Sequence, residues 1–246
     1  MSTPAFPVIS VHGLAKNYGD FQAVADLSFE VQPGEIVGLV GANGAGKTTS
    51  LRAITGILRP SAGQITVGGY DIQREAIEAK RTFAFIPDTV HPYELLTVTE
   101  HLHFVALTYR VQNAEAKYAA LLAELELSAK AHEPASSLSR GMVQKLSLAC
   151  AFLREPRVVI LDEPLTGLDP RGIRNIKQSI RRRAEQGTSF LLSSHLLVLV
   201  EALCDRVLIL NRGRKVAFGS LEEIRGSATL HEEASLEEVF FAVTET

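Results

Sequence analysis

A glycine-rich segment at residues 41–49, GANGAGKTT, has the residue types needed to hold a chain of phosphates. Gly41, Gly44 and Gly46 allow the backbone to curl, so that successive N–H groups point inward and bind an anion. Lys47 would place a positive charge on the terminal phosphates, and Thr48 would offer a hydroxyl to Mg²⁺. The predicted phosphate-binding residues are Gly41, Ala42, Asn43, Gly44, Ala45, Gly46, Lys47, Thr48 and Thr49.

The sequence on either side of this segment supports the same interpretation. It follows EIVGLV at 35–40, a short apolar run of the kind found in strands that are buried on both faces. A helix is expected to start at Gly46, which would add the positive end of its dipole to the phosphate site. Because a glycine-rich turn between a strand and a helix is the context of a P-loop, we predict a nucleotide site and not a chance turn.

Two adjacent carboxylates, Asp162 and Glu163, end a second apolar run, VVILDEP at 158–164. Successive side chains on a strand point to opposite faces, so both can reach one cavity only if the strand ends there. Asp162 is suited to hold Mg²⁺, through water, beside Thr48. Glu163 is suited to polarise an attacking water. Such a pair alone is more often a solvated loop, but a P-loop in the same chain favours the catalytic role.

A further unusual segment is SLSRGMVQKL at 137–146. It reads as an amphipathic helix from Val143 onward, and Ser139 precedes it. The residue three positions after Ser139 is Met142 and not Glu or Gln, so no capping box is expected. The backbone N–H groups of this first turn are therefore predicted to be available to a ligand.

The elements that must position these residues alternate along the chain. Alternating or apolar runs predict strands, and helical periodicity dominates from about residue 97 to 155 and returns after the Asp162 segment. Capping boxes are expected at Thr97–Glu100 and Ser235–Glu238. Strand and helix alternation on both sides of a helical insert predicts an α/β fold with a parallel sheet and a helical subdomain. Strands are expected within 8–19, 23–35, 63–72, 157–163 and 188–194, and helices within 114–127, 139–155, 171–187 and 235–243.

Composition narrows the possible functions. The 246 residues are 46% hydrophobic and 22% charged, as in ordinary globular proteins, and the net charge of −3 does not suggest a nucleic-acid binder. The basic triplet 181–183 is interpreted as a solvated helix face. Cys150 and Cys204 lack metal-ligand spacing, and Cys150 is expected in the core. The apolar stretch 189–210 contains charged residues, so it reads as strand, loop, helix and strand and not as a membrane span. Without a signal peptide, a cytoplasmic protein is expected.

Seven short motifs in order resemble the nucleotide-binding subunit of an ABC transporter over nearly the whole chain. They are Tyr18 in KNYG, the P-loop, the loop after FAFIP (83–87), LSRGM (138–142), VILDE (159–163), GLDP (167–170) and His195 after LLSS. The resemblance implies a P-loop NTPase fold with a mostly parallel sheet core, an N-terminal antiparallel β subdomain and an inserted α-helical subdomain.

A single nucleotide-binding domain over 1–246 follows from this resemblance. We expect a catalytic core with the β subdomain in 1–87 and 156–220. The helical subdomain with the signature segment would occupy 88–155, and a helical tail 221–246.

The resemblance also implies a role for each matching residue. Tyr18 would stack on adenine, and His195 would contact the γ-phosphate and the water near Glu163. Family members pair head to tail, so that Ser139 and Gly141 would close on the ATP of a second nucleotide-binding subunit. Their hydroxyl, close backbone approach and free N–H groups would make a second anion site. Asp169 would lie at the interface between the subunits.

Two positions depart from the family pattern. The signature usually reads LSGGQ, and here Arg140 replaces the first glycine of the pair and Met142 the glutamine. Arg140 would point to solvent or add a cation near the phosphates. The residue after FAFIP is usually glutamine, and here it is Asp88, which could hold Mg²⁺ but cannot donate a hydrogen bond while ionised. The segment 88–96 is the candidate coupling loop, with Tyr93 and Glu94 facing a partner.

We therefore expect an ATPase that uses ATP and Mg²⁺, dimerises as a homo- or heterodimer, and drives a separate integral membrane permease. It would attach through that permease to the inner face of the cell membrane. GLDP and the C-terminal LEEVFF resemble the bacterial exporter branch that moves drugs, lipids, polysaccharides or ions. The alternative is a soluble ABC-type ATPase acting on ribosomes or DNA, although those usually carry two such domains or a long coiled coil. A simple P-loop kinase or GTPase is a less favoured alternative, because the segment LSRGM would have no function in it.

Overall fold

The computed structural model describes residues 6–227, 231 and 234–244. Its centre is a six-stranded sheet in the order β10-β9-β3-β8-β7-β6. Neighbouring strands in this sheet are parallel except for β9 and β10, which are antiparallel. The strands are β3 (Ile36–Gly41), β6 (Phe83–Ile86), β7 (Val158–Asp162), β8 (Ser189–Ser193), β9 (Arg206–Asn211) and β10 (Arg214–Gly219).

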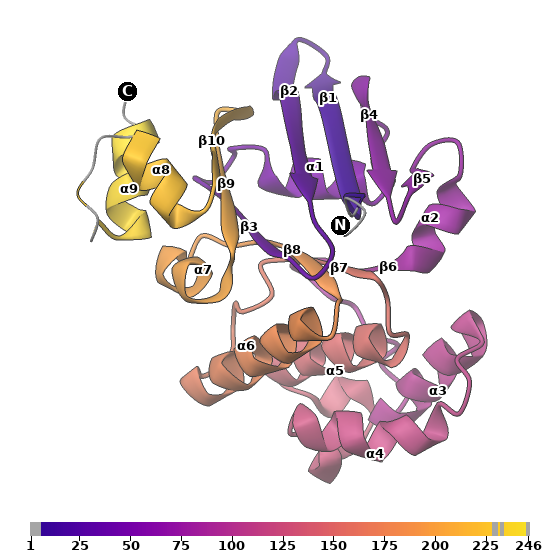
Figure 1. The fold of residues 1–246 in the computed structure, drawn as a ribbon. Coiled ribbons are helices and arrows are strands. Elements are labelled where there is room, and N and C mark those ends of the chain that lie inside the picture. The colour runs from indigo at the N-terminus through magenta and orange to yellow at the C-terminus, as the bar shows by residue number, and fades with distance from the viewer. Residues whose placement is uncertain (1–5, 228–230, 232–233, 245–246) are drawn as a thin grey trace, which may run out of the picture.

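A second sheet is antiparallel and has the order β2-β1-β4-β5. It comprises β1 (Ile9–Tyr18), β2 (Phe21–Val31), β4 (Ala62–Val67) and β5 (Tyr70–Asp71). One apolar core joins it to the central sheet through α1 (Lys47–Ile54), with Leu14, Leu39 and Leu51 as one contributor from each part. This packing holds α1, the helix that follows the P-loop, between the two sheets (Figure 1).

A group of helices lies at the opposite end of the molecule from the antiparallel sheet (Figure 1). It contains α3 (Val98–Tyr109), α4 (Glu115–Glu124) and α5 (Arg140–Leu153), with short 3₁₀ turns at Ser128–Lys130 and Ala135–Ser137. The remaining helices are α2 (Ala76–Thr82), α6 (Pro170–Glu185), α7 (Leu197–Leu203), α8 (Leu221–Ser227) and α9 (Leu236–Thr244).

The predicted fold class is confirmed. Strand, loop, helix and strand follow one another within 189–210, and both predicted capping boxes form, at Thr97 with Glu100 and at Ser235 with Glu238. Two elements, α2 and β10, were not predicted; α2 has no side-chain cap and half of β10 is exposed, so neither leaves a strong pattern. The subdomain boundaries stay a prediction, although α3 to α5 fall within 88–155.

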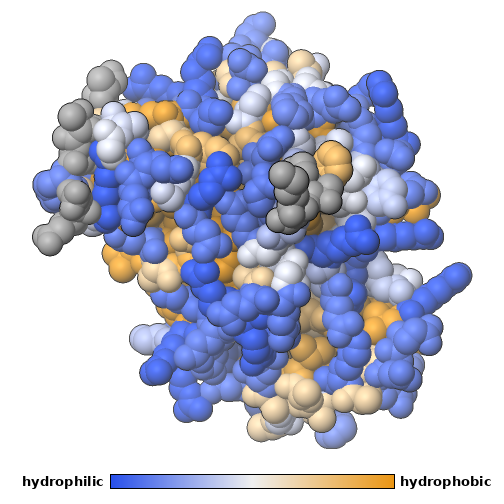
Figure 2. All heavy atoms as spheres, in the orientation of Figure 1, coloured by the Kyte–Doolittle hydropathy of each residue, from blue (hydrophilic) through white to orange (hydrophobic). Residues whose placement is uncertain are grey.

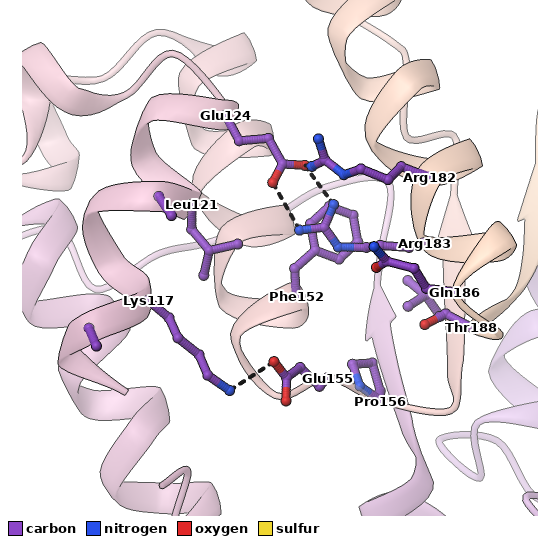
Figure 3. A pocket seen from close by; sticks show the side chains of 13 residues that line it. Lys117, Leu121, Glu124, Phe152, Glu155, Pro156, Arg182, Arg183, Gln186 and Thr188 are labelled. Atoms are coloured by element: carbon purple, nitrogen blue, oxygen red, sulfur yellow. Dashed lines mark hydrogen bonds and ion pairs between the residues drawn. The ribbon is translucent and has the colours of Figure 1, made fainter. Parts of the chain in front are cut away.

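The prediction that the basic triplet Arg181–Arg183 is a solvated helix face holds for Arg181 and Arg182, which are 42% and 53% exposed, and is wrong for Arg183; each of the three forms an ion pair. Arg182 and Arg183 both bind Glu124 of α4, at 2.5 Å. The guanidinium of Arg183 is only 15% exposed and lies 3.9 Å from the centre of the Phe152 ring. These groups line a cavity of about 530 Å³ between α4 and α6 (Figure 3). The triplet therefore ties the helical group to the core.

Cys150 was expected in the core, and the apolar stretch 189–210 was not expected to span a membrane. Cys150 is half-buried as a residue, and burial of its thiol raises the pKa of Cys150 to about 12. Among the described residues, no helix combines the length and apolar character needed to cross a membrane. Apolar side chains mix with polar ones on the visible face of the molecule (Figure 2).

Candidate nucleotide-binding site

The glycine-rich segment forms a tight loop between β3 and α1. Gly46 is the N-cap of α1, so the helix begins where the sequence predicted. The backbone of Gly44 has φ 79° and that of Gly46 has φ 101°, a region that favours glycine. A Cβ atom on Gly46 would lie 2.7 Å from the carbonyl oxygen of Ala23, so no side chain fits there. The conformation of the loop therefore depends on its glycines.

Lys47 is held against the loop from which it projects. Its Nζ donates to the carbonyl oxygens of Gly41 at 2.7 Å and Ala42 at 3.3 Å. Burial lowers the pKa of Lys47, whereas the charges of Glu163 and Asp162 act to raise it. The ammonium group thus lies between the loop and the two carboxylates that the sequence assigned to the same site.

Asp162 receives two hydroxyl groups on one carboxylate oxygen. Thr48 Oγ1 donates to Asp162 Oδ1 at 3.3 Å, and Ser193 Oγ donates to the same atom at 2.6 Å. Ser193 was not predicted as a site residue. It ends β8 and lies opposite Asp162 in the parallel pairing of β7 with β8, so only the strand register identifies it.

Glu163 turns away from the direction that a strand would give it. The strand β7 ends at Asp162, and Glu163 has φ 50°, in the left-handed region. Its N–H donates to Ser193 Oγ at 3.0 Å, which stabilises this turn. A left-handed conformation costs a residue with a side chain on the order of 1–2 kcal/mol, and such strain is concentrated at functional sites. The condition set by the sequence, that the strand must end between the two carboxylates, is therefore met.

His195 is brought to Glu163 by the loop after β8. Its Nδ1 lies 2.8 Å from Glu163 Oε2, and its backbone N–H also donates to that oxygen, at 3.4 Å. The carboxyl ends of the parallel strands β7 and β8 lie at one edge of the sheet, which explains why residues so far apart in sequence meet.

Most of the predicted site residues line one cavity of about 380 Å³. Its wall contains Tyr18 on the antiparallel sheet, Lys47 and Thr48 at the start of α1, and the carboxylates of Asp88 and Glu163. The full lining comprises Tyr18, Phe21, Ala23, Asn43, Gly44, Gly46, Lys47, Thr48, Thr49, Asp88 and Glu163. His195 lines a neighbouring cavity of about 390 Å³ together with Gly41, Ala42 and Asn43.

Two exposed aromatic rings stand at this cavity. Tyr18 and Phe21 are paired across the turn between β1 and β2, and they are 51% and 66% exposed. Lys16 Nζ lies 5.1 Å from the centre of the Tyr18 ring. Exposed rings beside a phosphate site can stack on a flat heterocycle. Phe21 was not predicted, although an aromatic residue directly after the Gly–Asp turn was a visible signal.

The start of α5 differs from the expectation in one respect. The helix begins at Arg140 with Ser139 as its N-cap, within the predicted range 139–155. The first-turn N–H groups are not all available, because Met142 N–H donates to Ser139 Oγ at 3.3 Å. The N–H groups of Arg140 and Gly141 have no acceptor within the part of the chain that the structure describes.

Ser139, Gly141 and Asp169 lie together but do not line the P-loop cavity. A Cβ atom on Gly141 would lie 3.1 Å from the carbonyl oxygen of Gly167, so the glycine allows α5 to approach the GLDP loop. Asp169 Oδ1 accepts from Gly172 N–H at 2.8 Å and caps α6. Gly141 and Asp169 thus have packing and capping roles in their own chain.

The donor atoms of the site are oxygens of the kind that Mg²⁺ prefers. Thr48 and Asp162 are already in contact, and Asp88 lines the cavity that Thr48 also lines. No cluster of three or more His, Cys, Asp or Glu side chains that could hold a metal occurs within residues 6–227, 231 and 234–244. This donor set fits Mg²⁺ that keeps several waters and is shared with substrate phosphates, and it does not fit an all-protein metal cage.

Comparison with known proteins identifies the chain. Residues 24–166 match the family model described as ABC transporter. The chain belongs to the ABC transporter family. Members of this family bind and hydrolyse ATP, so the chain is a P-loop ATPase.

Individual ABC relatives match nearly the whole chain. It is 34% identical over 239 residues to the ABC-type transporter ATP-binding protein EcsA of Bacillus subtilis, covering 96% of each chain. It is 36% identical to the Nod factor export ATP-binding protein I of Ralstonia nicotianae, covering 89% of this chain and 68% of that protein. A solved ATP-binding subunit of an ABC transporter superposes with a TM-score of 0.91 at 36% identity, over 96% of this chain and 99% of that one.

Proposed function

We propose that this chain is the ATP-hydrolysing subunit of an ABC exporter, that it dimerises around two ATP molecules and that it drives a separate membrane permease. The observation that carries the proposal is the position of Glu163. Its left-handed backbone ends β7 and places it in the wall of the cavity that also contains Lys47 and Thr48. A carboxylate beside a phosphate-binding loop has the geometry of a group that activates water.

In the proposed reaction, water forms a bond to the γ-phosphorus of ATP as the bond to the β–γ bridging oxygen breaks. Glu163 orients this water and polarises its O–H bond. Its contact with His195 restricts the carboxylate to one direction. Lys47 and the P-loop N–H groups stabilise the negative charge on the transferred phosphoryl oxygens. Magnesium, when bound with ATP, would neutralise further charge; Thr48, Asp162 through water, and Asp88 would hold it.

The proposed dimer is supported by the position of the signature segment. Arg140 and Gly141 present free N–H groups at the start of a 14-residue helix, where the helix dipole favours an anion. The chain's own P-loop cavity does not include Ser139 or Gly141. We infer that these groups, with Asp169 nearby, face the ATP of a second subunit, either a copy of this chain or a related one.

The proposed permease contact is the segment 88–96. A groove of about 270 Å³ lies between this segment, α3 and α5. The Tyr93 ring packs edge-to-face on Phe104 at 5.3 Å, yet Tyr93 is 61% exposed and Leu95 is 90% exposed. Exposed apolar groups beside a groove are typical of protein–protein contact sites. This contact would place the chain at the inner face of the cell membrane.

Export is the proposed direction because of the relatives' names. One relative is a Nod factor export ATP-binding protein, and another is a daunorubicin resistance ATP-binding protein of Streptomyces coeruleorubidus at 35% identity. The test is fractionation of cells that express the chain with and without a candidate membrane permease. We expect the chain in the membrane fraction only when the permease is present. Recovery in the same fraction in both cases would contradict the proposal.

A further inference from the structure

The two departures from the family pattern, Asp88 and Arg140, contact each other. Arg140 Nη2 lies 3.7 Å from Asp88 Oδ1, and the two side chains are 66% and 47% exposed. The sequence placed them in separate motifs and gave no reason to connect them. Arg140 is therefore largely exposed to solvent, one of the two alternatives that the sequence left open, and its guanidinium also reaches Asp88.

The path of the Arg140 side chain is defined by the GLDP loop. A Cβ atom on Gly167 would lie 3.2 Å from Arg140 Cδ and 3.4 Å from its Nε. Gly167 also has φ 80°, a conformation that favours glycine. The arginine thus crosses the loop at the one position without a side chain, and this contact directs the guanidinium towards Asp88.

Asp88 has a second possible partner. Asp88 lines the cavity that also contains Lys47, Thr48 and Glu163, and the Thr48 hydroxyl contacts Asp162. A carboxylate attracts both a guanidinium and a divalent cation, and engaging one weakens its hold on the other. An exposed ion pair is worth about 0–1 kcal/mol, so binding of a metal–nucleotide complex is sufficient to displace it.

We propose that Arg140 is a positioning residue that competes with the nucleotide-bound cation for Asp88, so that the Asp88–Arg140 pair opens when the metal–nucleotide complex binds. The inference rests on the proposed function, because it requires nucleotide binding with Mg²⁺. Arg140 directly precedes Gly141 in the first turn of α5. Opening of the pair therefore frees the signature segment of one subunit in response to the nucleotide held by that same subunit.

The proposal predicts effects of opposite sign for the two residues. Removing Arg140 leaves Asp88 free to serve the cation, so Arg140→Gln should strengthen metal-dependent nucleotide binding. Removing the charge of Asp88 should weaken it, so Asp88→Asn should reduce the gain that Mg²⁺ provides. In the Asp88→Asn background, Arg140→Gln should have no further effect, because its target is gone. Arg140→Lys keeps the charge and should remain closer to the wild type.

The experiment measures binding of a fluorescent, non-hydrolysable ATP analogue to the full chain, with saturating Mg²⁺ and with EDTA. The Kd measured with EDTA divided by the Kd measured with Mg²⁺ is the metal-dependent gain. Arg140→Gln should raise this ratio two- to fivefold, and Asp88→Asn should lower it by a similar factor. Melting temperatures of all variants show whether they are folded.

Hydrogen exchange of nucleotide-free protein gives a second readout. Segment 88–96 should exchange faster than in the wild type in both Arg140→Gln and Asp88→Asn. In the double variant it should exchange no faster than in either single variant.

Several results would overturn the inference. An unchanged ratio in Arg140→Gln would show that Arg140 does not act on Asp88. An effect of Arg140→Gln that is equally large in the Asp88→Asn background would show the same. A ratio unchanged in Asp88→Asn would show that Asp88 does not serve the cation. Failure of the wild type to bind the analogue at all would instead reject the proposed function, and the inference with it.

Discussion

His195 Nδ1 lies 2.8 Å from Glu163 Oε2, and the two residues follow the ends of adjacent parallel strands of one sheet. In the proposed function, this contact fixes the direction of a carboxylate whose backbone is already turned by a left-handed conformation. An ATPase whose water-activating group is held in this way depends on both residues, but in different degrees.

Replacing His195 by alanine should lower kcat for ATP hydrolysis by about 10- to 1,000-fold, because Glu163 loses the partner that orients it. Nucleotide affinity should change less than threefold, since His195 does not line the cavity that contains Lys47 and Thr48. Steady-state ATPase assays and equilibrium binding of a fluorescent ATP analogue measure the two quantities. A variant with normal kcat would show that the contact has no catalytic role.

The proposed head-to-tail arrangement can be tested by mixing two inactive subunits. Lys47→Ala should weaken nucleotide binding, and Ser139→Arg should block the signature segment. If the chain forms homodimers, a mixed dimer carries both lesions in one composite site and leaves the other intact. ATPase activity of the mixture should exceed that of either variant alone. The absence of rescue at every mixing ratio would argue against a composite site.

The Glu124 cluster predicts a pH-dependent contribution to stability. Burial acts to raise the pKa of Glu124, but hydrogen bonds from Arg183 and Ser179, with the charges of Arg183 and Arg182, outweigh it and lower the pKa. A depressed pKa stabilises the folded protein above the unfolded-state pKa of about 4.3, and this contribution is lost as the pH falls through the folded-state value.

Glu124→Gln should therefore lower the free energy of unfolding at pH 7 by on the order of 1–3 kcal/mol. The difference from the wild type should shrink as the pH falls below about 4.3. Urea unfolding at several pH values measures it, and Glu185→Gln, at an exposed position of α6, the helix that carries Arg182 and Arg183, is the control. A difference that does not depend on pH would show that the ion pairs do not contribute.

The permease contact predicts a separation of two activities. Tyr93→Ala with Glu94→Ala should leave ATPase activity of the isolated chain within about twofold, because neither side chain lines the nucleotide cavity. Recovery with permease-containing membranes should fall at least tenfold, since removal of a buried aromatic anchor at an interface costs about 2 kcal/mol or more. Leu107→Ala is the control, as Leu107 is an exposed apolar residue of α3 outside the groove. Loss of ATPase activity with unchanged membrane recovery would show that the loop is structural.

Much of the fold and site was predictable because local chemistry determines it. The P-loop requires glycines, a lysine and a threonine at fixed spacing, and the buried strands before Gly41 and Asp162 are continuous apolar runs. Ser193 and the Asp88–Arg140 pair were not predictable. Ser193 is identified only by the parallel register of β7 and β8, and the ion pair joins segments that meet through tertiary packing. Individual side chains carry no signal for contacts of this kind.

The most direct measurement of the central claim concerns Glu163→Gln. This variant should bind ATP with Mg²⁺ as the wild type does, because the phosphate loop is unchanged, and should hydrolyse it at least 100-fold more slowly, because the amide cannot accept the proton of the attacking water. Size-exclusion chromatography with ATP should then show a stable dimer that dissociates when ATP is removed. Hydrolysis at the normal rate, or a monomer at saturating ATP, would contradict the account.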